Sequence, residues 1–184
     1  MTTKTIGSEH KKVVDFYRKN IDVFAYKGQN GSLKYAFTEI AEAMDARIRA
    51  ENPGDLRRTE KETDYHAEIG DTMFMLLASI GIHDDSSEIF LHNMRRYLGR
   101  VENGDIELSG LYSDEVTEGV DAAISRAGEN IASALRDNPE GISFAMKVSN
   151  AIGAFDWRGE RLDKTIAKLQ KRCDNKRSEF NAAG

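Results

Sequence analysis

The chain has 184 residues, 40% of them hydrophobic and 31% charged, with only two prolines; this composition excludes an extensively disordered protein, and the length is sufficient for a stable core. A net charge of −5 excludes a global basic field for nucleic acid but leaves room for a local basic patch. The single cysteine, Cys173, excludes an internal disulfide and a cysteine-rich metal site.

Helical spacing of apolar residues recurs along most of the chain, whereas alternating strand-like runs are scarce. The segment 102–112 is the least helical stretch, and we interpret it as a linker or a small hairpin arm. The expected helices, in chain order, span residues 8–20, 32–51, 59–82, 85–101, 115–137, 140–155 and 158–181. The sequence therefore predicts an all-α helical bundle.

The expected helix 32–51 has two distinct faces. One is an apolar stripe at helical spacing, made of Leu33, Phe37, Ile40, Ala41, Met44 and Ile48. The other carries two acids, Glu39 and Glu42, beside the small residues Ala36, Ala43, Ala46 and Ala50. Because alanines allow close approach, we expect another helix or a ligand on this second face.

The expected helix 59–82 begins charged and becomes apolar on every side over residues 73–80. A helix without a polar face is buried all round, so we expect this half to lie in the core and to include an oligomer interface. Glu68 and Asp71 come just before the apolar part, at the threshold of the core.

Four carboxylates carry the chemical signal of the sequence. Glu39 and Glu42 are three residues apart, as are Glu68 and Asp71, so each pair projects from one face of its helix. None of the four has a basic residue three or four positions away, so their repulsion is not compensated locally. If the two helices pack side by side, the acids form an all-oxygen site that suits Mg²⁺ or Mn²⁺ better than Zn²⁺.

The alternative is a solvated acidic face, the usual role of paired acids in a chain with 31 acidic residues. The missing basic partners and the buried continuation after Asp71 argue against that alternative. On the pattern alone, both interpretations remain open.

The order of these motifs resembles the MazG-like all-α nucleoside triphosphate pyrophosphohydrolases, a superfamily that includes dCTP pyrophosphatases and dimeric dUTPases. An ExxE at 39–42 and an ExxD at 68–71 are followed by Ile80-Gly81-Ile82-His83-Asp84, similar to the turn that ends the family's apolar helix. Asn93-Met94-Arg95-Arg96-Tyr97 is similar to the N-x-x-R-Y of the dCTP pyrophosphatase branch. The resemblance covers residues 30–100.

The resemblance implies hydrolysis of a (d)NTP to (d)NMP and pyrophosphate with Mg²⁺, or alternatively Mn²⁺, as cofactor. It implies that Glu39, Glu42, Glu68 and Asp71 hold the metal, with Glu42 and Glu39 as the catalytic carboxylates. Asn93, Arg96 and Lys34 would bind the substrate phosphates. A solvated basic helix end is the alternative for Arg96, and Leu91-His92 replaces the family's basic residue ahead of the asparagine.

Residues ahead of the first acid pair are candidates for reading base and sugar, with ordinary loop polarity as the alternative: Tyr26, Lys27, Asn30, Lys34 and Tyr35. His66 and His83 are expected at the surface rather than as ligands, because the implied site is all oxygen. Trp157 is expected to anchor the last helices.

Two modules are expected, a catalytic one at 1–105 and a C-terminal half at 113–184. Residues 40–44 read like 131–135, and residues 78–81 like 150–153, so the second half is interpreted as a degenerate copy or as a coincidence of short motifs. In these registers Glu140 alone keeps an acid, opposite Glu68. We therefore expect the second half to be structural.

The predicted function is nucleotide-pool housekeeping by a homodimer or homotetramer. A specific dUTPase-like or dCTPase-like enzyme and a non-catalytic helical interaction protein are the alternatives. A basic C-terminal helix could bind nucleic acid, but interleaved acids favour a solvated helix, so no nucleic-acid partner is expected; its basic residues are Lys164, Lys168, Lys171, Arg172, Lys176 and Arg177. The start of the chain lacks a secretory signal and the longest apolar run, residues 73–82, is about half the ~20 residues of a membrane span, so we expect a cytoplasmic protein away from membranes.

Overall fold

A computed structural model describes residues 3–52, 64–98, 105–108 and 112–182. These ranges form eight α-helices and no β-strand, which confirms the all-α prediction. No helix within them is both long enough and apolar enough to cross a membrane. The helices are α1 (Ile6–Lys19), α2 (Gly28–Glu51), α3 (Tyr65–Ala78), α4 (Ser86–Leu98), α5 (Asp114–Thr117), α6 (Val120–Ala134), α7 (Ile142–Gly153) and α8 (Arg161–Ala182).

Local hydrogen bonds fix the helix ends. At the start of α1, the Ser8 amide donates to Thr5 Oγ1 and the Thr5 amide donates to Ser8 Oγ, which completes a capping box. Asp64 caps α3 by accepting from the Ala67 amide. After Ala78 the chain tightens through bonds three residues apart, so α3 ends four residues before the predicted position 82.

The predicted single helix 115–137 was wrong, because the chain breaks it into α5 and α6. Gly119 lies between them at φ +98°, a left-handed conformation that interrupts a right-handed helix and that glycine adopts without strain. Ser113 caps the short α5 by accepting from the Val116 amide.

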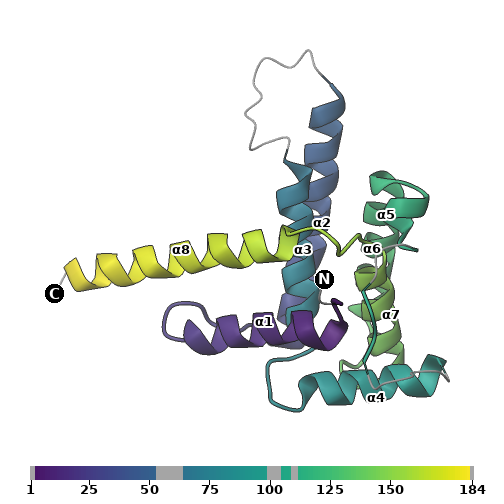
Figure 1. Cartoon of the computed structure of the whole chain (residues 1–184), viewed down its shortest axis with the longest axis horizontal. Helices are drawn as coiled ribbons and strands as arrows, with labels where there is room; N and C mark the ends of the chain where they lie inside the picture. The colour runs from purple at the N-terminus through teal and green to yellow at the C-terminus, as the bar shows by residue number, and fades with distance from the viewer. Residues whose placement is uncertain (1–2, 53–63, 99–104, 109–111, 183–184) are drawn as a thin grey trace.

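Two helix pairs, three crossing helices and the short α5, which packs on α6, make up the architecture. Figure 1 shows α2 and α3 side by side at the centre of the molecule, with α6 and α7 beside them. On the other side α1 and α8 both contact α3, and α8 runs outward to the C-terminus. The remaining long helix, α4, packs against α7 and α1. The α2–α3 pair therefore receives helices from both halves of the chain.

One apolar core joins both halves. The expected burial of residues 73–80 is confirmed for Met73, Phe74 and Leu76, each at most 1% exposed. Helices of the same chain cover α3, so its burial needs no second copy, and the oligomer interface expected there has no support from α3.

The predicted apolar stripe of α2 is only partly buried, because the helix is rotated toward its alanines. Leu33 and Ile40 lie in the core, but Phe37 is 44% exposed and Ile48 is 52% exposed. Three alanines of the second face, at positions 36, 43 and 46, are buried instead. The expectation that a helix approaches this face is confirmed, since α2 packs against α3 and α6.

The described residues of the segment 102–112 pair with the start of the chain rather than with each other. Glu107 forms an isolated antiparallel bridge with Thr5. The Leu108 amide donates to the Lys4 carbonyl at 2.8 Å, and the Ile6 amide donates to the Ile106 carbonyl at 2.8 Å. This segment therefore fastens the beginning of α1.

Candidate active site

Three glutamates from two helices converge where α2 and α3 pack side by side. Glu39 and Glu42 come from α2 and Glu68 from α3, and one carboxylate oxygen of each lies within 4.8 Å of the other two. Glu39 and Glu68 are half-buried, whereas Glu42 is exposed. None of the three forms an ion pair with a basic residue in the part of the chain that the structure describes. The structure thus brings together three of the four predicted acids.

The fourth acid, Asp71, is adjacent but faces α8. Thr165 Oγ1 donates a 2.9 Å hydrogen bond to Asp71 Oδ1, and the Lys168 ammonium pairs with Asp71 Oδ2. The Asp71 charge still reaches the cluster, because it contributes to raising the pKa of both Glu39 and Glu68. Asp71 therefore belongs electrostatically to the site while it is held by α8.

Mutual repulsion and burial perturb the cluster. Partial burial first, then the charges of Asp71, Glu42 and Glu68, raises the pKa of Glu39 to about 7. The pKa of Glu68 is also raised, by burial and by Asp71 and Glu42, although a hydrogen bond with Glu39 and the charge of Lys168 oppose the shift. The protein therefore stores uncompensated negative charge here, as functional sites commonly do.

A missing side chain lets α8 reach this site. Gly70 lies between Glu68 and Asp71, and a Cβ atom there would stand 2.8 Å from the Arg161 carbonyl oxygen and 2.7 Å from Thr165 Oγ1. Contacts that short do not occur without movement, so a larger residue would push α8 away. The glycine therefore positions Thr165 and Lys168 against Asp71.

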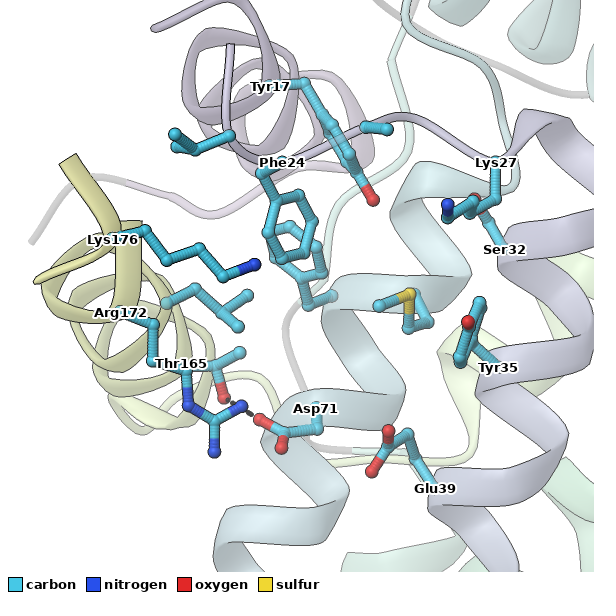
Figure 2. Close-up of a pocket in the computed structure, with 15 residues that line it drawn as sticks. Tyr17, Phe24, Lys27, Ser32, Tyr35, Glu39, Asp71, Thr165, Arg172 and Lys176 are labelled. Carbon is cyan, nitrogen blue, oxygen red and sulfur yellow. Dashed lines mark hydrogen bonds between the residues drawn. The ribbon is translucent and has the colours of Figure 1, made fainter. Parts of the chain in front are cut away.

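A cavity of about 390 Å³ opens beside the acids, with Glu39 and Asp71 in its wall. Figure 2 shows its aromatic side, where Tyr17 and Phe24 stand across from Tyr35 of α2. Edge-to-face and tilted contacts among Phe16, Tyr17, Phe24 and Phe74, with ring centroids 5.2 to 5.8 Å apart, fix this aromatic wall. Flat apolar surfaces of this kind suit a planar ring.

The same wall holds a spare hydrogen-bonding group. Ser32 is 1% exposed, and its Oγ is buried without a well-formed hydrogen bond among the described residues, although the Tyr17 and Tyr26 hydroxyls both lie near it. Buried polar atoms are nearly always paired, so an unpaired one in a cavity wall is a candidate contact for a ligand.

One side of α8 supplies the remaining wall. Four of its residues at helical spacing line the cavity: Thr165, Leu169, Arg172 and Lys176. Across from them, Lys27 stands at the start of α2 (Figure 2). The cavity therefore combines acids, aromatic rings and cations.

Two of the three predicted phosphate-binding residues, Lys34 and Asn93, are not brought to this cavity. Lys34 is exposed and does not line it. Asn93 is 9% exposed, donates to the Glu140 carbonyl at 3.1 Å, and lines a different cavity of about 250 Å³. The side chain of Arg96 lies outside the described residues.

Of the predicted base and sugar residues, Lys27 and Tyr35 line the cavity, while the exposed Asn30 does not. Tyr26 donates to the Ala78 carbonyl at 2.9 Å, which ties the loop before α2 to the end of α3.

The remaining expectations concern residues outside the acid cluster. His66 and His83 are exposed, as expected, and neither belongs to the acid cluster. Trp157 is 3% exposed and donates to the Ile152 carbonyl at 2.8 Å, so it anchors the junction of α7 and α8 as expected.

Sequence reasoning missed the α8 residues, including Thr165 and Lys168, because the second half was expected to be structural. A usable signal existed: Lys168 and Arg172 have no acidic residue three or four positions away. The acids were identified by the same kind of pattern, a charged residue without an oppositely charged neighbour on its helix.

Comparison with known proteins gives no relative. No protein-family model matches the chain, and neither curated proteins nor solved structures give a significant match.

Proposed function

We propose that this protein is a Mg²⁺-dependent (d)NTP pyrophosphohydrolase with a MazG-type helical bundle, which releases (d)NMP and pyrophosphate. The observation that carries the proposal is the convergence of Glu39, Glu42 and Glu68 within 4.8 Å beside a cavity with aromatic and cationic walls. A nucleoside triphosphate needs these three kinds of surface: a hard-cation site, a flat apolar wall and positive charge.

The donor set fits a hard divalent cation. Mg²⁺ prefers carboxylate oxygens, and Mn²⁺ accepts the same donors. Burial and then repulsion between the acids raise the pKa of Glu39 and Glu68, and such an ion would compensate the repelling charges. Glu39, Glu42, Glu68 and Asp71 would hold the metal. For this, at least one carboxylate oxygen of Asp71 would have to leave its contact on α8 and bind the metal instead.

The residues of the chain would divide the remaining work. When bound, Mg²⁺ would neutralise charge on the phosphate oxygens and help to deprotonate the attacking water. Glu42 is the most exposed of the three glutamates and would orient that water as the general base. Glu39, whose pKa of about 7 lies near neutral pH in the metal-free protein, is the second candidate for holding a proton.

The decisive experiment incubates the full chain with a panel of (d)NTPs and Mg²⁺ and separates the products. Release of (d)NMP with pyrophosphate from at least one (d)NTP supports the proposal. Release of (d)NDP with phosphate, or no turnover across the panel, contradicts it. The same panel decides between broad housekeeping of the cytoplasmic nucleotide pool and a dUTPase-like or dCTPase-like specificity.

A homodimer or homotetramer remains part of the proposal. Its support is the exposed apolar side of α2, where Phe37 is 44% exposed and Ile48 is 52% exposed. Light scattering of the wild type and of Phe37→Ser/Ile48→Ser tests it, because a monomeric wild type would contradict the proposal.

A further inference from the structure

Three cations of α8 take part in an ion pair within the described ranges, and Arg172 and Lys176 are the two unpaired ones that line the cavity; Lys164 and Lys171 are likewise unpaired but lie outside its wall. Elsewhere on α8, Arg161 pairs with Glu115, Lys168 with Asp71, and Arg177 with Asp22. Arg172 and Lys176 take part in no ion pair within the described ranges. They are one turn apart, so they repel each other as the acid pairs do.

These two cations line the cavity that holds Glu39 and Asp71. In Figure 2 both side chains extend from α8, and Lys176 reaches toward the aromatic wall at Phe24. Lys27 lies across from them on the α2 side and is also without an ion pair within the described residues. Positive charge therefore lines two sides of a cavity whose floor is acidic.

We propose that Arg172 and Lys176, together with Lys27, bind the polyphosphate chain of the substrate. The proposal rests on the proposed function and deepens it, because it moves phosphate recognition from Asn93 and Arg96 to the C-terminal helix. Asn93 already donates to the Glu140 carbonyl and lines another cavity. Arginine and lysine that line the same cavity as the acids give the phosphates a counter-charge that the acids cannot provide.

The geometry also orders the ligand along the cavity. If the phosphates lie between the acids and α8, the planar base of the nucleotide would stack on the wall made by Tyr17, Phe24 and Tyr35. Ser32 Oγ, which lacks a well-formed hydrogen bond in that wall, would then contact the base or the sugar. The ligand class is a nucleotide with two or more phosphates beyond the sugar-linked one.

Inorganic triphosphate is the probe, because it carries the phosphate chain without a base. Its dissociation constant is measured by calorimetry, at fixed Mg²⁺, for the full-length wild type and for Arg172→Gln/Lys176→Gln. The control is Lys164→Gln/Lys171→Gln, which removes the same charge from the same helix but outside the cavity wall. We expect the first variant to bind at least about tenfold more weakly, the scale of one lost charge-assisted hydrogen bond. The control should stay within about twofold of the wild type.

Equal affinities of the two double variants would overturn the proposal, as would a wild type that does not bind triphosphate. Arg172→Lys, which keeps the charge, should recover most of the affinity. Failure of the proposed function looks different: the wild type would bind triphosphate through α8 but release no pyrophosphate from any (d)NTP. Conversely, if the wild type hydrolyses a (d)NTP but the two double variants bind triphosphate equally well, only the role of α8 in phosphate binding is contradicted.

Discussion

The pairs α2–α3 and α6–α7 place acidic residues in opposite electrostatic situations. In the α6–α7 region, Asp137 pairs with Lys147 at 2.6 Å and accepts from Ser143 Oγ at 2.8 Å. In the α2–α3 pair, the three converging glutamates form no ion pair among the described residues, and the repulsion from one another and from Asp71 is only partly opposed by the charge of Lys168. The acid of the first region is neutralised by a lysine of α7, whereas the glutamates of the second have no such basic partner among the described residues.

The comparison bears on the expected degenerate repeat. Glu140, the acid that aligns with Glu68, lies in the turn before α7 rather than within a helix. Ser143, which aligns with Asp71, serves the Asp137–Lys147 ion pair. A degenerate second copy stays a prediction. In such a copy, the polar residues that correspond to the acid cluster would have been replaced by residues that pair with one another.

The largest expected effect is on catalysis. Glu42→Gln should lower kcat/KM by about 10²-fold or more, the scale of a lost general base, because the amide neither takes a proton nor carries the charge that holds the metal. Steady-state release of pyrophosphate measures it. Asp137→Asn and Glu140→Gln should keep near wild-type turnover, and an equal loss in Glu140→Gln would mean that both pairs contribute to the active site.

The second effect concerns stabilisation by metal. Because the proposed Mg²⁺ would bind the folded cluster and not the unfolded chain, a hundredfold excess over Kd should raise the free energy of unfolding by about 2.7 kcal/mol. For a chain of this size that is roughly 5–10 °C in Tm. Glu42→Gln and Asp71→Asn should lose most of this increment, and Asp137→Asn should keep it. Melting curves in EDTA and in Mg²⁺ check this, and the same increment in every variant would assign the acids to a solvated face.

The third effect separates the two ion pairs, Lys168–Asp71 and Lys147–Asp137. Lys168→Met and Lys147→Met should each cost about 1 kcal/mol of metal-free stability, because both pairs are partly exposed. Only Lys168→Met should change the Mg²⁺ increment, which should increase because the cluster loses its competing cation. Denaturant unfolding with and without Mg²⁺ measures both quantities. An unchanged increment in Lys168→Met would show that the ammonium does not compete with the metal.

These pairs also show where sequence reasoning succeeds and where it stops. Spacing along one helix identified Glu39 with Glu42 and Glu68 with Asp71, because neighbours on a helix surface are fixed by its 3.6-residue period. The turn of Asp71 toward Thr165 depends on a contact between residues 94 positions apart, which no local pattern encodes. Gly70 was visible in the sequence, but its role emerges only once α8 lies against it.

The prediction of the fold succeeded where it depended on local helix period and was wrong where it depended on a single backbone conformation or on long-range packing. Helix identity follows from apolar period, and α1, α2, α4, α7 and α8 were expected close to their observed ranges. The break at Gly119 depends on one backbone conformation, and the rotation of α2 depends on which face α3 and α6 cover. The α8 cations were missed because the second half was expected to be structural, although Lys168 and Arg172 have no acidic residue three or four positions away.

The last expected effect is a difference in sign between the two regions as pH changes. The folded pKa of Glu39, about 7, exceeds the ordinary value of 4.5, so the folded state binds more protons than the unfolded state between those values. The free energy of unfolding of the metal-free protein should therefore fall as pH rises through this window. The Lys147 ion pair lowers the pKa of Asp137 below 3.8, so its contribution is present above that pH and is lost as pH falls through the folded pKa. Glu39→Gln should flatten the first dependence and leave the second, and Asp137→Asn should do the reverse. Denaturant unfolding in EDTA from pH 3 to 8 measures both, and a Glu39→Gln profile parallel to the wild type between about pH 4.5 and 7 would show that the burial and repulsion that raise the pKa of Glu39 do not act on folding.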